Sequence, residues 1–163
     1  MRKTAKAGPV VWDVIVIGAG PAGLFAARAL SGKFSVLVLD EKPRTGGTGA
    51  MTDGKLNLSP QIGLDLQELQ ITEEEAAERI ERIDEIFLEH GADRTLYGTD
   101  RERIGLWLDR VSWARRRTPK GDWDITLLPA KQRHMGTDFA HRVVGRITDS
   151  IAKSGAEFRL GTK

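Results

Sequence analysis

The chain has 163 residues, 40% of them hydrophobic, which is enough for one folded domain with a buried core. Its 25 Lys and Arg residues nearly balance its 23 Asp and Glu residues, and the resulting net charge of +2 argues against nucleic acid as a partner. The longest aliphatic runs have four residues, whereas a membrane-spanning helix needs roughly 20, so the sequence predicts no membrane segment.

Cysteine is absent from the chain, which excludes disulfides, thiolate metal sites and cysteine nucleophiles within it. A protein without cysteine fits a reducing compartment, and we expect a cytoplasmic location and no metal site. Residues 1–9 contain three basic residues but no apolar segment or small-residue cleavage site after them, so they do not resemble a secretion signal. We expect these nine residues to be a flexible N-terminus.

The first elements alternate between strand and helix. Residues 10–17 form an apolar run rich in β-branched side chains that ends at glycines, which is typical of a parallel strand buried on both faces. A helical pattern follows over 22–30, and a second apolar run covers 35–39. This order predicts an α/β domain of the Rossmann-like, three-layer type with a mostly parallel sheet, extending over residues 10–163.

The middle of the chain changes character. Residues 44–63 are rich in Gly, Thr, Ser and Asn and show little periodicity, which indicates a long ordered loop. Capping signatures at Thr72 and Thr99, each with Glu three positions later, then predict two helices. In the second helix Trp107 falls on an apolar stripe and is expected in the core. We interpret residues 64–118 as a helical insertion.

Arg115 to Arg117 follow that stripe, at the expected end of the second helix, where cations are favoured. Tryptophans near such a cationic run are compatible with base stacking, but surface exposure and core packing explain them better. The last elements are a helix over about 138–154 and a strand from Phe158 to Leu160 that reads as an inner strand of the sheet. Because an inner strand needs a covering crossover, we expect the domain to be incomplete.

The residues with the clearest chemical meaning form G-x-G-x-x-G at residues 18–23, where the first strand meets the first helix. Gly18 is expected to permit the tight turn, Gly20 to let the backbone approach a pyrophosphate, and Gly23 to let helix and strand pack closely. Pro21 suits the first helical turn, and the free N–H groups there, including that of Ala22, favour phosphate oxygens. This context predicts a dinucleotide-binding site.

Asp40 lies at the end of the second strand, 22 positions after Gly18. A carboxylate at this place accepts hydrogen bonds from both hydroxyls of an adenosine ribose and repels a 2′-phosphate. The motif does not fix the register of the loop, so Glu41 is kept as the alternative ribose ligand.

The residues after Asp40 separate FAD from NAD. Arg44, Gly46 and Gly47 follow it in a pattern that resembles the acidic-x-x-x-R-x-G-G continuation in the FAD-binding domains of glutathione-reductase-like and hydroxylase-like flavoenzymes. Arg44 would place a cation near the nucleotide, and the glycines would let the backbone run beneath an extended FAD. The alternative is a plain turn with a surface arginine.

The disulfide reductases of that superfamily carry a redox cysteine pair shortly after the double glycine, and residues 48–56 of this chain contain none. The T-D-G-K-L core of this loop and Gln132 to Asp138 resemble a group of poorly characterised FAD-dependent dehydrogenases. Because a cysteine pair is missing, a dithiol relay is excluded and electrons would pass directly between flavin and substrate. Lys55, Arg133 and His134 are candidate flavin or substrate contacts in these segments, against the alternatives of surface exposure and helix capping.

The sequence therefore predicts the FAD-binding part of a flavin-dependent dehydrogenase or reductase, acting by hydride transfer through flavin N5 on a small-molecule substrate, with NAD(P)H as a possible electron donor. The alternatives are an NAD-binding dehydrogenase domain and a catalytically silent nucleotide-binding module. No catalytic residue, substrate or oligomeric state can be assigned. The predicted cofactor-binding residues are Gly18, Gly20, Pro21, Ala22, Gly23, Asp40, Glu41, Lys42, Arg44, Gly46, Gly47 and Thr48.

Overall fold

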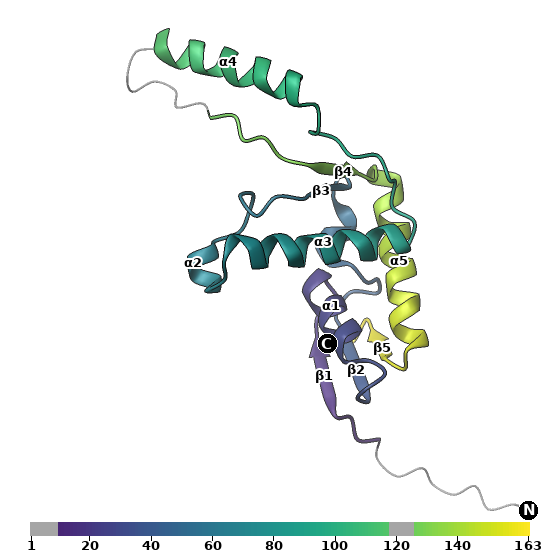
Figure 1. The fold of residues 1–163 in the computed structure, drawn as a ribbon. Helices are drawn as coiled ribbons and strands as arrows, with labels where there is room; N and C mark the ends of the chain where they lie inside the picture. Colours follow the sequence, from purple (N-terminus) through teal and green to yellow (C-terminus); the bar gives the residue numbers. More distant parts are fainter. Residues whose placement is uncertain (1–9, 118–125) are drawn as a thin grey trace, which may run out of the picture. The chain divides into compact units, whose positions relative to one another are not determined.

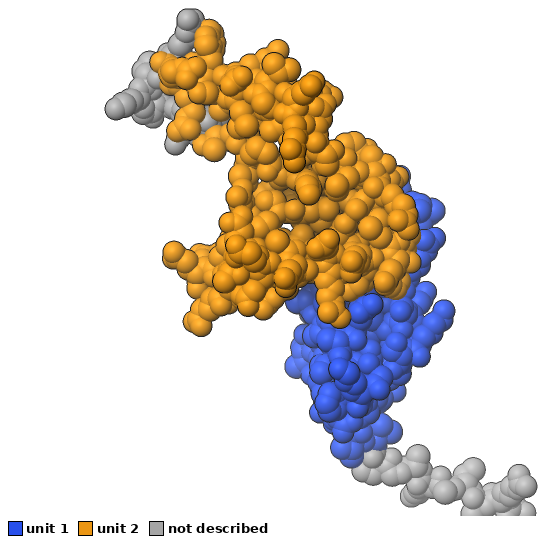
Figure 2. Space-filling view, in the orientation of Figure 1, with its two compact units in different colours: residues 1–52, 138–163 blue, residues 53–137 orange. Residues whose placement is uncertain are grey.

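The computed structural model describes residues 10–117 and 126–163 (Figure 1). The expected flexible N-terminus, residues 1–9, and the expected end of the helical insertion at residue 118 lie outside them. The chain divides into two compact units, which Figure 2 distinguishes by colour. Unit 1 comprises residues 1–52 and 138–163, and unit 2 comprises residues 53–137.

Unit 1 has the α/β order that the sequence predicts. Its elements are β1 (Val14–Ile17), α1 (Pro21–Leu30), β2 (Val36–Asp40), the short 3₁₀ helix η1 (Gly47–Met51), α5 (Thr137–Lys153) and β5 (Glu157–Leu160). The three strands form a parallel sheet in the order β1-β2-β5. This arrangement confirms the Rossmann-like fold class.

The core of unit 1 lies around β2. Val36, Leu37 and Val38 are almost completely buried, because β2 has a hydrogen-bonded strand on each side. Helix α1 packs on β1 and β2 with Leu24 and Ala27 buried. The apolar run in β2 thus behaves as a central strand, as expected.

The expectation that the first strand is buried on both faces is wrong. Ile15 is 54% exposed and Ile17 is 88% exposed. In the described sheet β1 pairs with β2 alone, and residues 10–12 are not part of the strand. The expected inner strand at the end of the chain, β5, also pairs only with β2 and stands at the opposite edge of the described sheet. Apolar runs therefore predicted the strands but not their places in the sheet.

Helix α5 supplies much of the remaining core of unit 1. Its most buried residues are Ala140, Val143, Ile147 and Ile151, which recur at helical spacing on one face. The sequence predicts this face from the helical spacing of Ala140, Val144, Ile147 and Ile151, and the structure differs only in burying Val143 in place of Val144, which is half-buried. The prediction of this helix is confirmed to within one residue at each end.

The described part of unit 2 contains three helices and a small antiparallel sheet. The helices are α2 (Leu66–Leu69), α3 (Glu73–Glu89) and α4 (Arg101–Arg117), and the strands are β3 (Lys55–Asn57) and β4 (Gln132–His134). The predicted capping box is present at the start of α3, where Thr72 and Glu75 exchange hydrogen bonds. The loop expected over 44–63 is not continuous, because it contains η1 and β3.

The predictions for α4 need two corrections. Asp100, not Thr99, caps the helix, since its carboxylate accepts a hydrogen bond from the Arg103 N–H at 3.0 Å. Trp107 is 52% exposed and not in the core, and Trp113 is 54% exposed. Arg110 lies over the Trp107 ring, 5.0 Å from its centre. None of the α4 side chains that the structure describes is buried.

Candidate functional site

The loop between β1 and α1 has the geometry of a close backbone turn. Gly18 has a φ of 97°, in the left-handed region that favours glycine. A Cβ at Gly23 would lie 1.8 Å from the Gly18 carbonyl oxygen, so only glycine allows this approach of helix and strand. A Cβ at Gly20 would meet no atom within 4 Å, although the Gly20 backbone is in an ordinary extended conformation. Gly20 thus faces open space, as does Gly18, but Gly20 does so without a positive φ.

The N-terminus of α1 is open in the same loop. Gly20 is its N-cap residue, no side chain caps it, and Pro21 occupies the first helical position without losing a donor. The N–H groups of Ala22 and Gly23 belong to the first turn, where an α-helix offers no internal acceptor. Together with the positive end of the helix dipole they form a site for an anion beside Gly20.

Asp40 connects the end of β2 to this loop. One of its carboxylate oxygens accepts a hydrogen bond from the Ala19 N–H at 2.6 Å, and the other accepts one from the Lys42 N–H at 2.7 Å. The hydrogen bond from Lys42, then that from Ala19, and the Lys42 charge lower the pKa of Asp40 below its usual value of 3.8. Asp40 therefore stays ionised at neutral pH.

Glu41, the alternative ribose ligand, has a different environment. Its side chain is exposed and forms a surface ion pair with Lys42, with 3.3 Å between Oε1 and Nζ. Only Asp40 of the two carboxylates is hydrogen-bonded to the loop between β1 and α1. Of the two carboxylates, Asp40 is therefore the one that is held against the glycine loop.

The second glycine segment packs directly on the first loop. The Gly46 N–H donates to the Ala19 carbonyl at 2.7 Å, and Gly46 has a φ of 95°. A Cβ at Gly47 would lie 3.3 Å from the Gly20 Cα, and a Cβ at Gly49 would lie 2.6 Å from the Pro21 ring. The two glycine-rich segments are therefore in van der Waals contact, although more than 20 residues separate them.

Arg44 and Thr48 flank this segment and are both exposed. Arg44 makes no hydrogen bond or ion pair with another residue in the described parts of the chain. Its guanidinium group is thus available to an anionic ligand, and no interaction among the described residues fixes its direction.

Lys55 and His134, from the two segments of the family resemblance, are cross-strand partners in β3 and β4. Lys55 pairs with Asp53 at 2.8 Å, and the His134 ring lies 3.1 Å from the Asp53 carbonyl oxygen. The hydrogen bond from the Lys55 side chain is the largest cause of a lowered pKa for Asp53. A Cβ at Gly54 would lie 2.7 Å from the Gly136 backbone, so this pairing is tight.

Arg133 has a role that neither sequence-based alternative anticipated. It lies in β4, not at a helix start, and it is 7% exposed. Its guanidinium group forms a two-pronged pair with Asp84 of α3, at 2.5 and 2.8 Å, and donates to the Asp93 and Arg94 carbonyls at 3.2 and 2.7 Å. Asp84 raises the pKa of Arg133 further. These contacts occupy the donors of the guanidinium group, so Arg133 joins β4 to α3 within unit 2.

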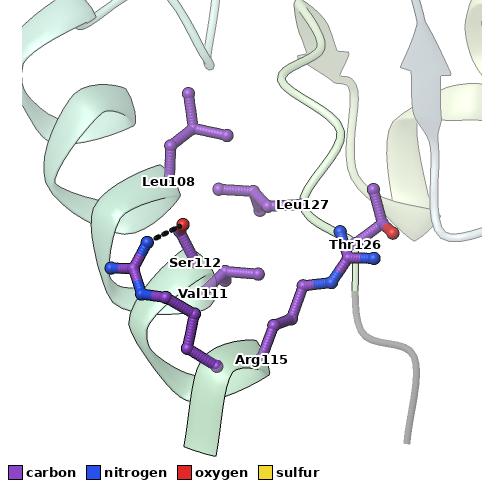
Figure 3. A pocket seen from close by; sticks show the side chains of 7 residues that line it. Leu108, Val111, Ser112, Arg115, Thr126 and Leu127 are labelled. Carbon is purple, nitrogen blue, oxygen red and sulfur yellow. Dashed lines mark hydrogen bonds between the residues drawn. The ribbon is translucent and has the colours of Figure 1, made fainter. Parts of the chain in front are cut away.

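A hollow of about 410 Å³ lies beside α4 in unit 2 (Figure 3). It is lined by Leu108, Val111, Ser112, Arg115, Arg116, Thr126 and Leu127. Arg116 donates a hydrogen bond to the Ser112 hydroxyl at 3.1 Å. None of the sequence-predicted site residues lines this hollow.

Within residues 10–117 and 126–163, no three His, Asp or Glu side chains converge as metal ligands. Over the same ranges, no helix combines the length and the apolar character that crossing a membrane requires.

Comparison with known proteins bears on the site in unit 1. Residues 16–62 match the family model of the NAD(P)-binding Rossmann-like domain. The matched range contains both glycine segments and Asp40, which the structure brings together. Over this range, less than a third of the chain, the sequence is similar to a Rossmann-like nucleotide-binding domain, in agreement with the fold of unit 1.

A curated relative of this Rossmann-like domain is the sarcosine oxidase subunit alpha of Corynebacterium sp. (strain U-96). The two are 44% identical over 68 residues, which is 38% of this chain and 7% of that protein. The similarity is thus confined to a small part of a much longer chain.

Solved structures share the fold at low sequence identity. Glycine oxidase from Bacillus cereus ATCC 14579 has a TM-score of 0.52 at 16% identity, covering 94% of this chain and 48% of that one. 3-Ketosteroid-delta4-(5alpha)-dehydrogenase from Rhodococcus jostii RHA1 has a TM-score of 0.53 at 16% identity, covering 92% of this chain and 38% of that one. L-amino acid deaminase from Proteus vulgaris has a TM-score of 0.51 at 18% identity, covering 99% of this chain and 42% of that one. The chain thus spans less than half of each.

Sequence reasoning missed the partners of two site residues. It identified Asp40 as a ribose ligand but not its bonds to Ala19 and Lys42, and it did not foresee the Arg133–Asp84 pair. The available signal for the pair was the position of Asp84 on the apolar face of α3, four residues after Ile80 and three before Phe87, because a carboxylate on a buried face needs a partner.

Proposed function

We propose that this chain forms the FAD-binding part of a flavin-dependent oxidoreductase of the dehydrogenase or reductase class. The observation that carries the proposal is the contact between the two glycine segments, in which Gly46 and Gly47 pack on Ala19 and Gly20. A backbone surface without side chains beside an open helix N-terminus suits the long, flat pyrophosphate and ribityl part of an extended FAD.

The residues present fit this cofactor. Gly20 leaves room for the pyrophosphate, the first turn of α1 offers N–H donors, and ionised Asp40 is placed to accept ribose hydroxyls. When bound, FAD would supply hydride transfer at flavin N5. This chain contains no cysteine pair, so its own residues would bind and orient the cofactor and leave the redox step to flavin and substrate.

The names of the similar proteins support the proposal that this chain belongs to an oxidoreductase. The sarcosine oxidase subunit, the glycine oxidase and the ketosteroid dehydrogenase are named as oxidases or as a dehydrogenase. We propose a small-molecule substrate, NAD(P)H as a possible electron donor and a cytoplasmic location, the last because a cysteine-free chain suits a reducing compartment. Reduction of the bound flavin by NADH or NADPH would support the choice of donor, and an absence of reduction would oppose it.

We keep Lys55 and His134 as proposed flavin or substrate contacts, because both side chains are exposed. Arg133 is withdrawn from this role, since its guanidinium group is committed to Asp84 and two carbonyls. A lysine beside the flavin ring would stabilise negative charge on it. Lys55→Met should then lower the midpoint potential of the bound flavin, and an unchanged potential would refute the role of Lys55.

The test of the proposed function is a titration of the purified chain with FAD, followed by absorbance between roughly 350 and 500 nm, where the flavin that carries the redox chemistry absorbs. We expect saturable binding with a perturbed flavin spectrum. Gly20→Ser is the matched control, because its new side chain would cap α1 and occupy the phosphate position. FAD uptake that is absent, or equal in both proteins, would refute the proposal.

An NAD-binding domain is the second candidate, favoured by the family model that matches residues 16–62. It predicts saturable binding of NAD, competition by NAD against FAD, and no flavin retained in the purified protein. A silent nucleotide-binding module predicts FAD binding without reduction by any donor. The same titration, repeated with NAD and followed by NADH addition, separates the three functions.

A further inference from the structure

Helix α5 contacts the cofactor-facing loop of unit 1 through a pair of hydroxyl groups. Thr45 Oγ1 and Thr148 Oγ1 lie 2.9 Å apart, although 103 positions separate the two residues. Thr148 also donates to the Val144 carbonyl, one helical turn earlier, at 3.0 Å. Because a hydroxyl has a single proton, Thr148 uses its own on Val144 and accepts the proton of Thr45.

Thr45, one member of this hydrogen-bonded pair, directly precedes Gly46, the first residue of the second glycine segment. Gly46 is buried between η1 and α5, where a Cβ would lie 2.6 Å from the Ala50 Cβ and 2.8 Å from a methyl group of Val144. The Gly46 N–H is the donor to the Ala19 carbonyl. Thr148, Thr45 and Gly46 therefore form a continuous connection from α5 to the loop that precedes α1.

We propose that Thr148 is a positioning residue for the dinucleotide site. It fixes the distance between the backbone of residues Thr45–Gly47 and the backbone of Gly20. The inference rests on the proposed function, because the segment matters only if a dinucleotide lies against it. The hydroxyl of Thr148 is engaged by Thr45 and by the Val144 carbonyl. It acts through Thr45, whose hydroxyl has no other hydrogen-bond partner among the described residues.

The close packing of Gly47 on Gly20 makes the pyrophosphate position sensitive to the placement of the Thr45–Gly47 segment. Gly47 approaches Gly20 closely, with 3.3 Å between a Cβ at Gly47 and the Gly20 Cα, so a small displacement of the segment either blocks or opens the pyrophosphate position. Removing the Thr148 hydroxyl leaves the half-buried Thr45 hydroxyl without its acceptor. The segment is then free to shift so that Thr45 reaches water.

The experiment compares Thr148→Val with Thr148→Ser. Valine keeps the shape but loses the acceptor, and we expect FAD affinity to fall by roughly three- to tenfold, the effect of one neutral hydrogen bond. Serine keeps the hydroxyl and should restore affinity to within about twofold of the original chain. In a double-mutant cycle, Thr45→Val combined with Thr148→Val should lose no more affinity than either single variant, because both remove one interaction.

Ile151→Val is the control for general loosening of α5. Ile151 is 1% exposed and contacts the core one turn from Thr148, so its truncation should lower the melting temperature without changing FAD affinity. An affinity for Thr148→Val equal to that of the original chain, or reduced no more than that of Ile151→Val, would overturn the proposal.

A second readout requires no ligand. The exchange rate of the Gly46 amide hydrogen should rise in Thr148→Val and stay unchanged in Ile151→Val, because only the first variant releases the segment from α5. If the original chain binds no dinucleotide, the proposed function fails while this exchange measurement still decides the link between α5 and Gly46. Equal exchange rates for Gly46 in all variants would contradict the link.

Discussion

Both units of the molecule contain close glycine contacts, but among the described residues only unit 2 contains a buried charge pair. In unit 1 the close contacts run through glycines, as between Gly23 and Gly18 or Gly47 and Gly20. In unit 2 a buried charge pair joins Arg133 to Asp84, 49 positions earlier in the chain. A glycine pattern is visible in the local sequence, whereas a charge pair depends on a partner far along the chain. This difference explains why the close glycine contacts of unit 1 could be predicted and the charge pair of unit 2 could not.

The largest effect should come from breaking the charge pair. Arg133→Met leaves the Asp84 carboxylate buried without its partner, and we expect unfolding free energy to fall by about 3–5 kcal/mol. Urea denaturation measures this loss. Lys131→Met, an exposed cation two residues earlier, should change stability by less than about 0.5 kcal/mol.

The double variant Arg133→Met, Asp84→Leu separates the effect of the unpaired charge from that of the lost hydrogen bonds. Replacing both charges by apolar residues should recover much of the lost stability, because no unpaired buried charge remains. If the double variant is as unstable as Arg133→Met, the hydrogen bonds from Arg133 to the Asp93 and Arg94 carbonyls matter more than its charge.

A smaller effect should come from the glycine contacts of unit 1. Gly23→Ala forces a methyl group against the Gly18 carbonyl oxygen, and overpacking of this kind should cost about 1–3 kcal/mol or more. Gly20→Ser, three residues earlier, adds its atoms to open space and should leave the melting temperature unchanged or higher. Equal destabilisation by both variants would contradict the distinct roles assigned to these glycines.

The smallest effect concerns Asp40 and pH. Its folded-state pKa is lowered, so its contribution to stability is present above its usual pKa of 3.8 and is lost as the pH falls through the lower folded-state value. The stability difference between the original chain and Asp40→Asn should thus be constant near neutral pH and shrink below pH 3.8. A difference that changes between pH 5 and 8 would mean that another group titrates there.

The accuracy of the sequence-based predictions follows the same division. The helices α1, α3 and α5 and the strand β2 were predictable, because apolar periodicity and caps such as Thr72 are local signals. The pairing of β3 with β4 was not, since these three-residue strands contain a single apolar residue, Leu56. The exposure of Ile17 and Trp107 was also missed, because periodicity places a residue on a face but does not say what covers that face.

The same limit applies to the candidate site. The glycines of residues 18–23 and Asp40 could be predicted because their spacing along a strand-turn-helix is fixed by geometry. The contribution of α5, through Thr148 and Val144, could not, because nothing in the sequence links residues about a hundred positions apart.

The most direct test of the central claim is a map of backbone amide chemical shifts during FAD addition to the ¹⁵N-labelled chain. The account predicts that the amides of residues 18–23 and of Asp40 to Gly47 in unit 1 shift in proportion to occupancy. It also predicts that those of α4 in unit 2 stay in place. Shifts that are absent, or confined to α4 and the hollow beside it, would contradict the assignment of the dinucleotide site to unit 1.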